Sequence, residues 1–297
     1  MYHILAFITI LIWGVTFIST KILLEQGLTP SDIFILRFIL GYIGMALYSH
    51  KKWFCDNWRD EAIMVMAGIT GGSLYFVGEN TALLYTQAGN VSLIICLAPL
   101  LTALFSQIKK TDETTSVRLW IGSVIALAGV AFVVNDDSGS HANPLLGNTL
   151  ALLSAACWAC YQLLIKPISN QYDVSMLTRK VFGYGLITMV PYWIYTAPAS
   201  GISHILPLLE RPVVLGNIIF LGLMASLMGY LLWNLVVQHL GAVVSSNYIY
   251  LDPLITCIFA YFILDEPLTT AMLLGGIGIL AGIYIAVGIP KPKRAPK

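Results

Sequence analysis

The sequence contains little charge. Only 10% of its 297 residues are charged and 58% are hydrophobic, whereas an average soluble protein carries about 25% charged residues. The mean hydropathy is +0.80. So few polar groups cannot cover a surface that faces water, so the composition excludes an ordinary soluble domain and predicts an integral membrane protein. The formal net charge of +1 also argues against nucleic acid as a partner.

Features typical of several other protein classes are missing as well. The five cysteines are odd in number and lie mostly inside apolar runs, which argues against a disulfide framework. The first apolar run has no basic leader, so we expect no cleavable signal peptide. The histidines show no metal-ligand spacing, and the sequence contains no P-loop. We therefore expect no metal, no other cofactor and no enzymatic activity.

Long apolar runs predict ten transmembrane helices, because a bilayer crossing needs about 20 apolar residues. The runs are divided by short separators that carry turn residues or charge. The expected spans are 4–24, 31–49, 62–86, 88–108, 118–134, 147–166, 173–197, 215–238, 243–264 and 269–289. The predicted fold class is an all-α integral membrane protein.

Positive charge predicts how the chain is oriented, because Lys and Arg near the ends of spans stay in the cytoplasm. With the N-terminus inside, most basic residues, such as Lys51, Lys109 and those of the tail 291–297, fall on the cytoplasmic side. Lys21 and Arg211 are the exceptions near the other side. We expect a multi-pass protein of the cell membrane (inner or plasma membrane) with both termini in the cytoplasm.

The chain also contains an internal repeat, which constrains the architecture. The matches occur in the same order: Trp13 with Trp158, Lys21 with Lys166, Arg37 with Arg179, Asn80 with Asn234, Pro99 with Pro253, and Glu113 with Glu266. Each half has five expected spans, so the second copy must enter the membrane upside down. Inverted repeats recur in transporters, with the substrate site at their interface. We expect five-helix repeats at 1–138 and 144–290, followed by a basic cytoplasmic tail at 291–297.

These repeated residues resemble the drug/metabolite transporter superfamily, in particular its ten-helix EamA-type members. The resemblance is carried by Trp13-Gly14 with Lys21, Arg37-Phe38, Ala98-Pro99-Leu100-Leu101-Thr102, Leu251-Asp252-Pro253-Leu254 and Asp265-Glu266-Pro267-Leu268. One departure is Trp158-Ala159, where the second half lacks the Trp-Gly pair. The resemblance implies secondary active export or exchange of small metabolites, amino acids and drugs among them.

Asp252 is the deepest carboxylate in the expected spans. It lies about 14 Å into span 243–264 at the helical rise, close to the middle of the membrane. Ionisable groups at that depth cost about 3 kcal/mol or more, which makes them functional candidates. We expect Asp252 to couple transport to protons or to bind a cation. The alternatives are a structural pair with a neighbouring helix, for example with Arg179, and an inert position on a wet cavity wall.

Glu79 and Arg37 lie at a similar depth, about 10 Å from the same side of the membrane. They either form an ion pair between adjacent helices or bind the amino group and the carboxylate of a substrate. Tyr75 lies one turn before Glu79 on the same helical face. Because burial raises the pKa of a carboxyl group, Glu79 is a second candidate for proton coupling.

Aromatic and amide side chains recur on helical faces and predict an apolar pocket with few polar anchors. The alternatives are ordinary packing, aromatic belts at the membrane interface and hydrogen bonds between helices. Besides Arg37, Tyr75 and Glu79, the candidate binding residues are Trp13, Thr16, Asn80, Trp158, Tyr161, Gln162, Asn234 and Tyr248.

Three further patterns have mainly structural interpretations. Lys21 and Lys166 are expected to reach the lipid headgroups, with a gate contact as the alternative. Glu113 and Glu266 resemble the acids that stabilise helix starts. The G-x-x-x-G of Gly278 and Gly282 permits close helix packing, within one chain or between two.

Together these features predict a secondary active transporter of small polar metabolites such as amino acids, an exporter or exchanger working by alternating access. Proton coupling is one option. The alternatives are a passive channel, a lipid flippase and an integral-membrane transferase; the short loops argue against the transferase, because they cannot gather polar groups at one interface. The expected partners are a small-molecule substrate, the lipid bilayer and protons, and the oligomeric state is left open.

Overall fold

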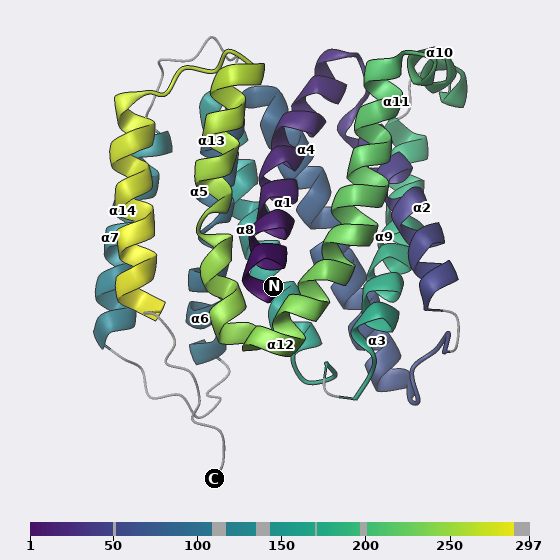
Figure 1. The fold of residues 1–297 in the computed structure, drawn as a ribbon, viewed down its shortest axis with the longest axis horizontal. Helices are drawn as coiled ribbons and strands as arrows, with labels where there is room; N and C mark the ends of the chain where they lie inside the picture. Colours follow the sequence, from purple (N-terminus) through teal and green to yellow (C-terminus); the bar gives the residue numbers. More distant parts are fainter. Residues whose placement is uncertain (50–51, 109–116, 135–142, 170, 197–200, 288–297) are drawn as a thin grey trace.

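The computed structural model describes the whole chain except residues 50–51, 109–116, 135–142, 170, 197–200 and 288–297. The described residues form a bundle of helices and contain no strand (Figure 1). Along the chain the segments are α1 (Tyr2–Glu25), α2 (Pro30–Tyr48), α3 (Trp58–Gly68), η1 (Ile69–Leu74), α4 (Tyr75–Tyr85), α5 (Ala88–Ile95), α6 (Ala98–Ile108), α7 (Val117–Val134), α8 (Pro144–Ile165), α9 (Val174–Thr196), η2 (Gly201–His204), α10 (Ile205–Leu209), α11 (Pro212–Ile219), η3 (Phe220–Met228), α12 (Gly229–Ile249), α13 (Asp252–Ile263) and α14 (Thr270–Val287).

The helices confirm a membrane protein. Within the described residues, six stretches are long and apolar enough to cross a membrane: Tyr2–Glu25, Pro30–Tyr48, Trp58–Tyr85, Ala88–Ser106, Pro144–Ile165 and Pro212–Val236. Helices α7, α9, α13 and α14 lie at the other four expected spans, so ten crossings stay a prediction. Large apolar side chains such as Leu47 and Ile277 are 77% and 67% exposed, which suits a surface in contact with lipid. The expected tail 291–297, Lys51, Lys109 and Glu113 lie outside the described residues.

Local sequence signals set several helix ends. Thr29 caps α2 in a capping box with Asp32, in which each side chain accepts a hydrogen bond from the other residue's backbone. Asn57 caps α3 through its side chain. At the end of α1, Gly27 has a φ of 99°, a left-handed conformation that glycine adopts without a steric cost. The chain can therefore turn sharply from α1 into α2.

Two long helices contain π-helical segments. One segment, η1, lies between α3 and α4, and the other, η3, lies between α11 and α12. Segments of this kind are rare and are frequent at functional sites, because they shift the backbone hydrogen-bond pattern. Each packs against a helix from the other half of the sequence, η1 against α9 and η3 against α2. The residues beside them therefore lie at contacts between the two halves.

The expected spans 88–108 and 243–264 are both interrupted. Helix α5 ends at Ile95 and α6 begins at Ala98, while α12 ends at Ile249 and α13 begins at Asp252. A proline is the second residue after each break, and proline cannot supply the backbone N–H that a continuous helix needs. The prediction of one continuous helix over 243–264 is therefore wrong. Asp252 is the first residue of a half-helix rather than a residue in the middle of a helix.

Helices α7 and α14 pack closely at one edge of the bundle (Figure 1, left). A Cβ atom on Gly278 would lie 3.2 Å from the Cα of Gly129, and one on Gly282 would lie 2.6 Å from the carbonyl oxygen of Gly122. These glycines let the two backbones touch. The G-x-x-x-G pattern therefore serves packing within one chain.

Candidate functional site

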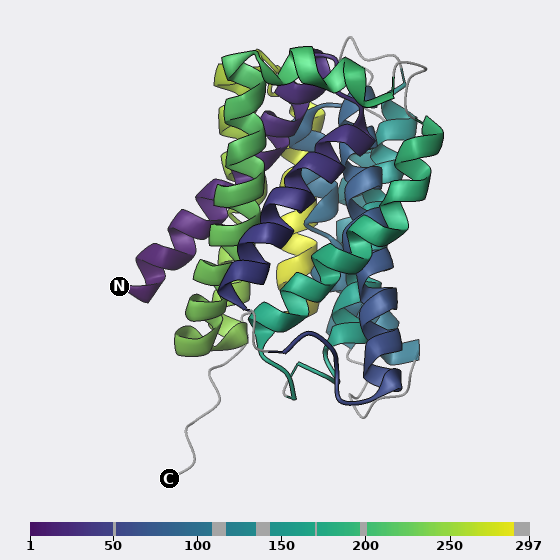
Figure 2. The same ribbon diagram turned by 90° about the vertical axis from the view of Figure 1, so that its right-hand side faces the viewer.

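Side chains from both halves of the sequence contact one another inside the bundle. We call this group the central cluster. Its members lie in α1, α2, α4, α8, η3, α12 and α13: Trp13, Arg37, Tyr75, Glu79, Trp158, Tyr161, Ser226, Tyr230 and Asp252. Helix α1 crosses the bundle obliquely, with its N-terminal end projecting from one side (Figure 2).

Arg37 is the cation of the cluster. It is 5% exposed, and its Nε donates a hydrogen bond to Ser226 Oγ at 2.9 Å. Its guanidinium lies over the ring of Phe76 at 4.6 Å, a cation–π contact. Arg37 and Glu79 interact electrostatically, but they are not among the ion pairs within 4.0 Å that the described residues form. The ion-pair alternative is therefore not realised in this conformation.

Glu79 and Asp252 are the two acids of the cluster. Glu79 is 2% exposed and interacts electrostatically with Tyr75, which lies one turn earlier on the same helix. Asp252 stands in the first turn of α13, where the helix dipole favours a carboxylate. Its Oδ1 atom is buried and has no hydrogen-bond partner. Since Glu79 and Asp252 also interact electrostatically, the cluster holds one positive and two potentially negative groups.

Aromatic rings form the walls of the cluster. Trp158 lies with its ring centroid 4.9 Å from those of both Tyr75 and Tyr161. On the other side, the rings of Trp13 and Tyr230 lie 5.8 Å apart. Tyr230 also interacts electrostatically with Tyr75, Tyr161, Glu79 and Arg37. Tyrosines of α4 and α12 therefore interact with the charged groups of the cluster.

For five of the predicted binding residues, no contact with the charged groups of the cluster is found among the described residues. Thr16 donates to a carbonyl of its own helix at 2.6 Å, and Asn80 donates to the carbonyl of the first residue of α2 at 3.2 Å. The Nδ2 of Asn234 is buried without a hydrogen-bond partner, and Gln162 is exposed. The hydroxyl of Tyr248 pairs with a histidine near the start of α1 at 2.6 Å. The structure thus gathers Trp13, Arg37, Tyr75, Glu79, Trp158, Tyr161 and Asp252 from the predicted set.

Two members of the cluster were missed from the sequence. Ser226 belongs to η3, and Tyr230 lies one turn before Asn234 in α12. At the spacing that relates Asn80 to Asn234, Ser226 corresponds to Gly72 and Tyr230 to Phe76. Because the equivalent positions hold different residue types, the internal repeat that identified Trp13 and Trp158 could not identify Ser226 or Tyr230.

Arg179, the repeat partner of Arg37, lies elsewhere. Its guanidinium donates hydrogen bonds to the backbone carbonyls of Ser49 and Lys52 and lies over the ring of Trp53 at 4.4 Å. The alternative in which Arg179 pairs with Asp252 is therefore not realised. A surface pocket of about 540 Å³ lies in this region, away from the central cluster, and is lined by Tyr48, Ser49, Lys52, Gln171, Tyr172, Asp173 and Met176.

Lys21 forms a buried ion pair instead of reaching lipid headgroups. Its Nζ lies 2.5 Å from Glu266 Oε1, and the two side chains are only 8% and 6% exposed. The same ammonium donates to the carbonyl of Thr86 at 3.1 Å. Both oxygens of Glu266 accept from the N–H of Ala88, at 3.1 and 2.9 Å, so Glu266 caps α5 rather than α14. For Lys21 the remaining alternative is a gate contact. Lys166 is exposed, as a lysine that reaches the headgroups would be.

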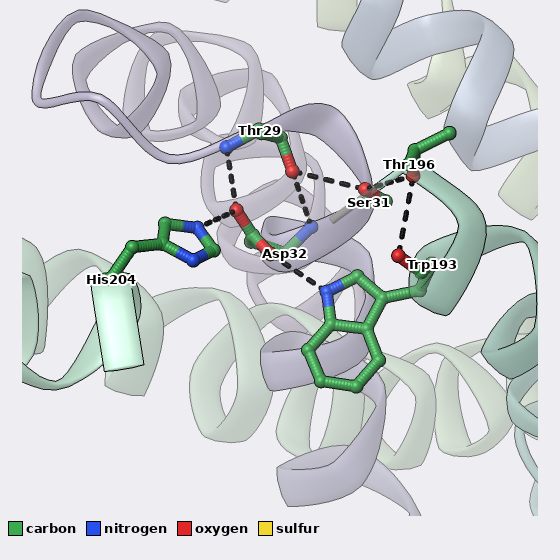
Figure 3. A network of polar contacts seen from close by, with 6 residues as sticks. All are labelled: Thr29, Ser31, Asp32, Trp193, Thr196 and His204. Carbon is green, nitrogen blue, oxygen red and sulfur yellow. Dashed lines mark hydrogen bonds and ion pairs between the residues drawn. The ribbon is translucent and has the colours of Figure 1, made fainter. Parts of the chain in front are cut away.

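A second buried network lies at the start of α2 (Figure 3). The carboxylate of Asp32 is fully buried and accepts hydrogen bonds from the Thr29 backbone N–H at 2.9 Å and from Trp193 Nε1 at 2.7 Å. His204 Nε2 lies 3.0 Å from the same carboxylate. The Ser31 and Thr196 hydroxyls are 3.4 Å apart. Asp32 therefore connects the start of α2 to the end of α9 and to η2.

Comparison with known proteins identifies the family. Residues 1–135 and 145–288 match the model of the EamA-like transporter family. The chain belongs to the EamA-like transporter family. The match spans most of the sequence, so this EamA-like protein is a multi-pass membrane transporter, and its family implies a small-molecule substrate.

Similar proteins carry transporter names. An uncharacterized transporter from Archaeoglobus fulgidus is 28% identical over 290 residues, which cover 95% of this chain and 96% of the relative. A probable amino-acid metabolite efflux pump from Escherichia coli is 23% identical, with 96% and 94% coverage. A probable terminal-alkyne amino-acid exporter from Streptantibioticus cattleyicolor is 23% identical, with 94% and 90% coverage. One solved crystal structure has the same fold, with a TM-score of 0.63, 16% identity and 99% coverage of both chains.

Proposed function

We propose that this EamA-like protein is a secondary active transporter of small polar metabolites such as amino acids, an exporter or exchanger working by alternating access. The observation that carries the proposal is the central cluster. One arginine and two acids from different helices lie among aromatic rings, next to the break at which Asp252 begins α13. Burying a charged side chain inside a membrane costs free energy, so such side chains usually bind a ligand or a coupling ion.

The proposed architecture is two inverted repeats, at 1–138 and 144–290. Two features support it. The helix breaks before Ala98 and Asp252 are 154 residues apart (252 − 98), as are Asn80 and Asn234 (234 − 80). The packing is also reciprocal, since η3 contacts α2 and η1 contacts α9. Broken helices at the repeat interface are typical of transporter binding sites, because half-helix ends supply oriented dipoles to a ligand.

The charges of the cluster favour a ligand with both an amino group and a carboxylate. Glu79 and Asp252 are suited to the amino group and Arg37 to the carboxylate. The aromatic rings of Trp13, Trp158 and their neighbours are suited to the apolar part of the ligand. The names of two relatives, which mention amino acids or their metabolites, agree with this class.

Coupling to protons is the second part of the proposal. Asp252 has a buried carboxylate oxygen without a partner, and Glu79, which is also buried, interacts with it electrostatically. Each could exchange a proton as the ligand binds or leaves. We place the protein in the cell membrane with both termini in the cytoplasm, because basic residues concentrate on that side of the expected spans.

Counterflow in proteoliposomes tests the proposal. Vesicles loaded with each of the twenty standard amino acids are diluted into traces of the same labelled amino acid, at pH 6 and pH 8. We expect saturable, transient accumulation of at least one amino acid, with a rate that differs between the two pH values. Linear flux that does not saturate would instead indicate a passive channel. Exchange of labelled lipid between leaflets without amino-acid flux would indicate a flippase.

A further inference from the structure

The π-helical segment η3 holds two side chains of the first half of the chain. Trp13 Nε1 donates a hydrogen bond to the carbonyl of Ala225 at 3.1 Å. Arg37 Nε donates to the hydroxyl of the next residue, Ser226, at 2.9 Å. Ser226 is 1% exposed, so this contact is shielded from solvent. A π-helical segment shifts the backbone hydrogen bonds of the helix, and here it presents a carbonyl and a hydroxyl to the central cluster.

The contact with Ser226 determines which part of Arg37 is free. A guanidinium has five N–H donors, and the Nε–H is occupied by Ser226. The Cζ atom of the guanidinium lies over the Phe76 ring, 4.6 Å from the ring centroid. Among the described residues, no hydrogen-bond partner is found for the two terminal nitrogens. A carboxylate can approach an arginine through Nε and one terminal nitrogen or through both terminal nitrogens, and only the second mode is open here.

The other half of the chain lacks this arrangement. Gly72 in η1 corresponds to Ser226 and has no hydroxyl to offer. Arg179, which corresponds to Arg37, bonds to the backbone carbonyls of Ser49 and Lys52 outside the cluster. The proposed repeats therefore contribute one arginine rather than two. A ligand carboxylate has a single place to bind, although the surrounding helices are related by a repeat.

We infer that Ser226 is a positioning residue that fixes Arg37 as the carboxylate-binding group and so makes the substrate bind in one orientation. The carboxylate binds to the two terminal nitrogens of Arg37, and the amino group faces Glu79 and Asp252. This inference rests on the proposed function, since it assumes a ligand with a carboxylate in the central cluster. It adds a residue and a binding geometry that the repeat pattern does not contain.

The test compares an amino acid with its amide, in which the carboxylate is replaced by a neutral group of similar size. Thermal stabilisation of the detergent-purified transporter by the twenty amino acids first selects the probe, and its dissociation constant is then compared with that of its amide. For Ser226→Ala we expect the amino acid to bind about tenfold more weakly, because a hydrogen bond that orients a charged group is lost. The affinity for the amide should not change.

Two further variants separate positioning from a general structural effect. Ser226→Thr keeps the hydroxyl and should restore the ratio of the two dissociation constants. Ser73→Ala, in the other π-helical segment, removes a hydroxyl that bonds to the Gly185 carbonyl at 3.1 Å and should leave the ratio as in the wild type. If Ser226→Ala weakens the binding of the amino acid and of its amide equally, or changes neither affinity, the inference is overturned while the proposed function stands. If no amino acid binds to the wild type and none shows counterflow, the proposed substrate class fails first.

Discussion

At the scale of single residues, Asp252 is the main candidate for proton coupling. It begins α13, and one of its carboxylate oxygens is buried without a partner. We expect Asp252→Asn, which keeps the size but cannot exchange a proton, to abolish amino-acid accumulation driven by a pH gradient in proteoliposomes. Counterflow at equal pH should persist. Asp265→Asn is the matched control, because Asp265 is exposed in the connection to α14; full pH-driven accumulation in Asp252→Asn would refute the assignment.

For Glu79 we make a prediction about binding, because we propose that it contacts the amino group of the substrate. Loss of a charged hydrogen bond costs about 1.5–3 kcal/mol, so we expect Glu79→Gln to weaken amino-acid binding roughly tenfold to a hundredfold. Binding of the deaminated analogue, which has no amino group, should change little, and titration calorimetry can measure both. Glu25→Gln, at the exposed end of α1, is the control. An equal loss for both ligands would show that Glu79 acts on folding rather than recognition.

At the scale of helices, the Asp32 network predicts stability rather than transport. Asp32→Ala removes the acceptor of the Thr29 N–H and of Trp193 Nε1 at once. A buried donor left without its acceptor costs about 1–3 kcal/mol. We expect Asp32→Ala to lower the Tm in detergent by several degrees. Asp56→Ala removes an exposed partner of Lys52 and should leave the Tm within error; a wild-type Tm in Asp32→Ala would show that the network contributes nothing.

Most helices could be predicted because apolar length and capping residues act locally. The apolar runs that begin after Thr29 and Asn57 predict spans whose starts agree with those of α2 and α3 within a few residues. The interruptions could not be read from hydropathy, because Cys96 and Tyr250 lie inside long apolar runs; the local signals for them are Pro99 and Pro253. The depth of Asp252 was accordingly counted along a helix that is not continuous.

Part of the candidate site was visible in the sequence because charge inside an apolar span is conspicuous. Arg37, Glu79 and Asp252 were found this way, and the repeat added Trp13 and Trp158. The hydrogen-bond partners of these residues could not be predicted, because bonds between segments far apart in the sequence produce no regular spacing. Arg37 bonds to a residue 189 positions away, and Lys21 to one 245 positions away.

At the scale of the whole molecule, the Lys21–Glu266 pair lies where three segments of the bundle meet. It joins the end of α1, the hairpin between α4 and α5, and the connection from α13 to α14. Its two residues belong to different proposed repeats. A buried ion pair adds little net stability but is strongly destabilising when one partner is removed. Such a contact is suited to a seal that opens in one step of an alternating-access cycle.

Removing the ammonium should open this seal. In a variant whose single cysteine is Cys96, 4% exposed at the break between α5 and α6, a membrane-impermeant thiol reagent reports access to the interior. We expect Lys21→Met to increase labelling of Cys96 from the face that carries Lys21 severalfold, because Glu266 is left buried without its cation. Lys166→Met, at the exposed repeat-equivalent lysine, should leave the labelling rate unchanged. Equal labelling in both variants, or none, would mean that the pair does not seal this face.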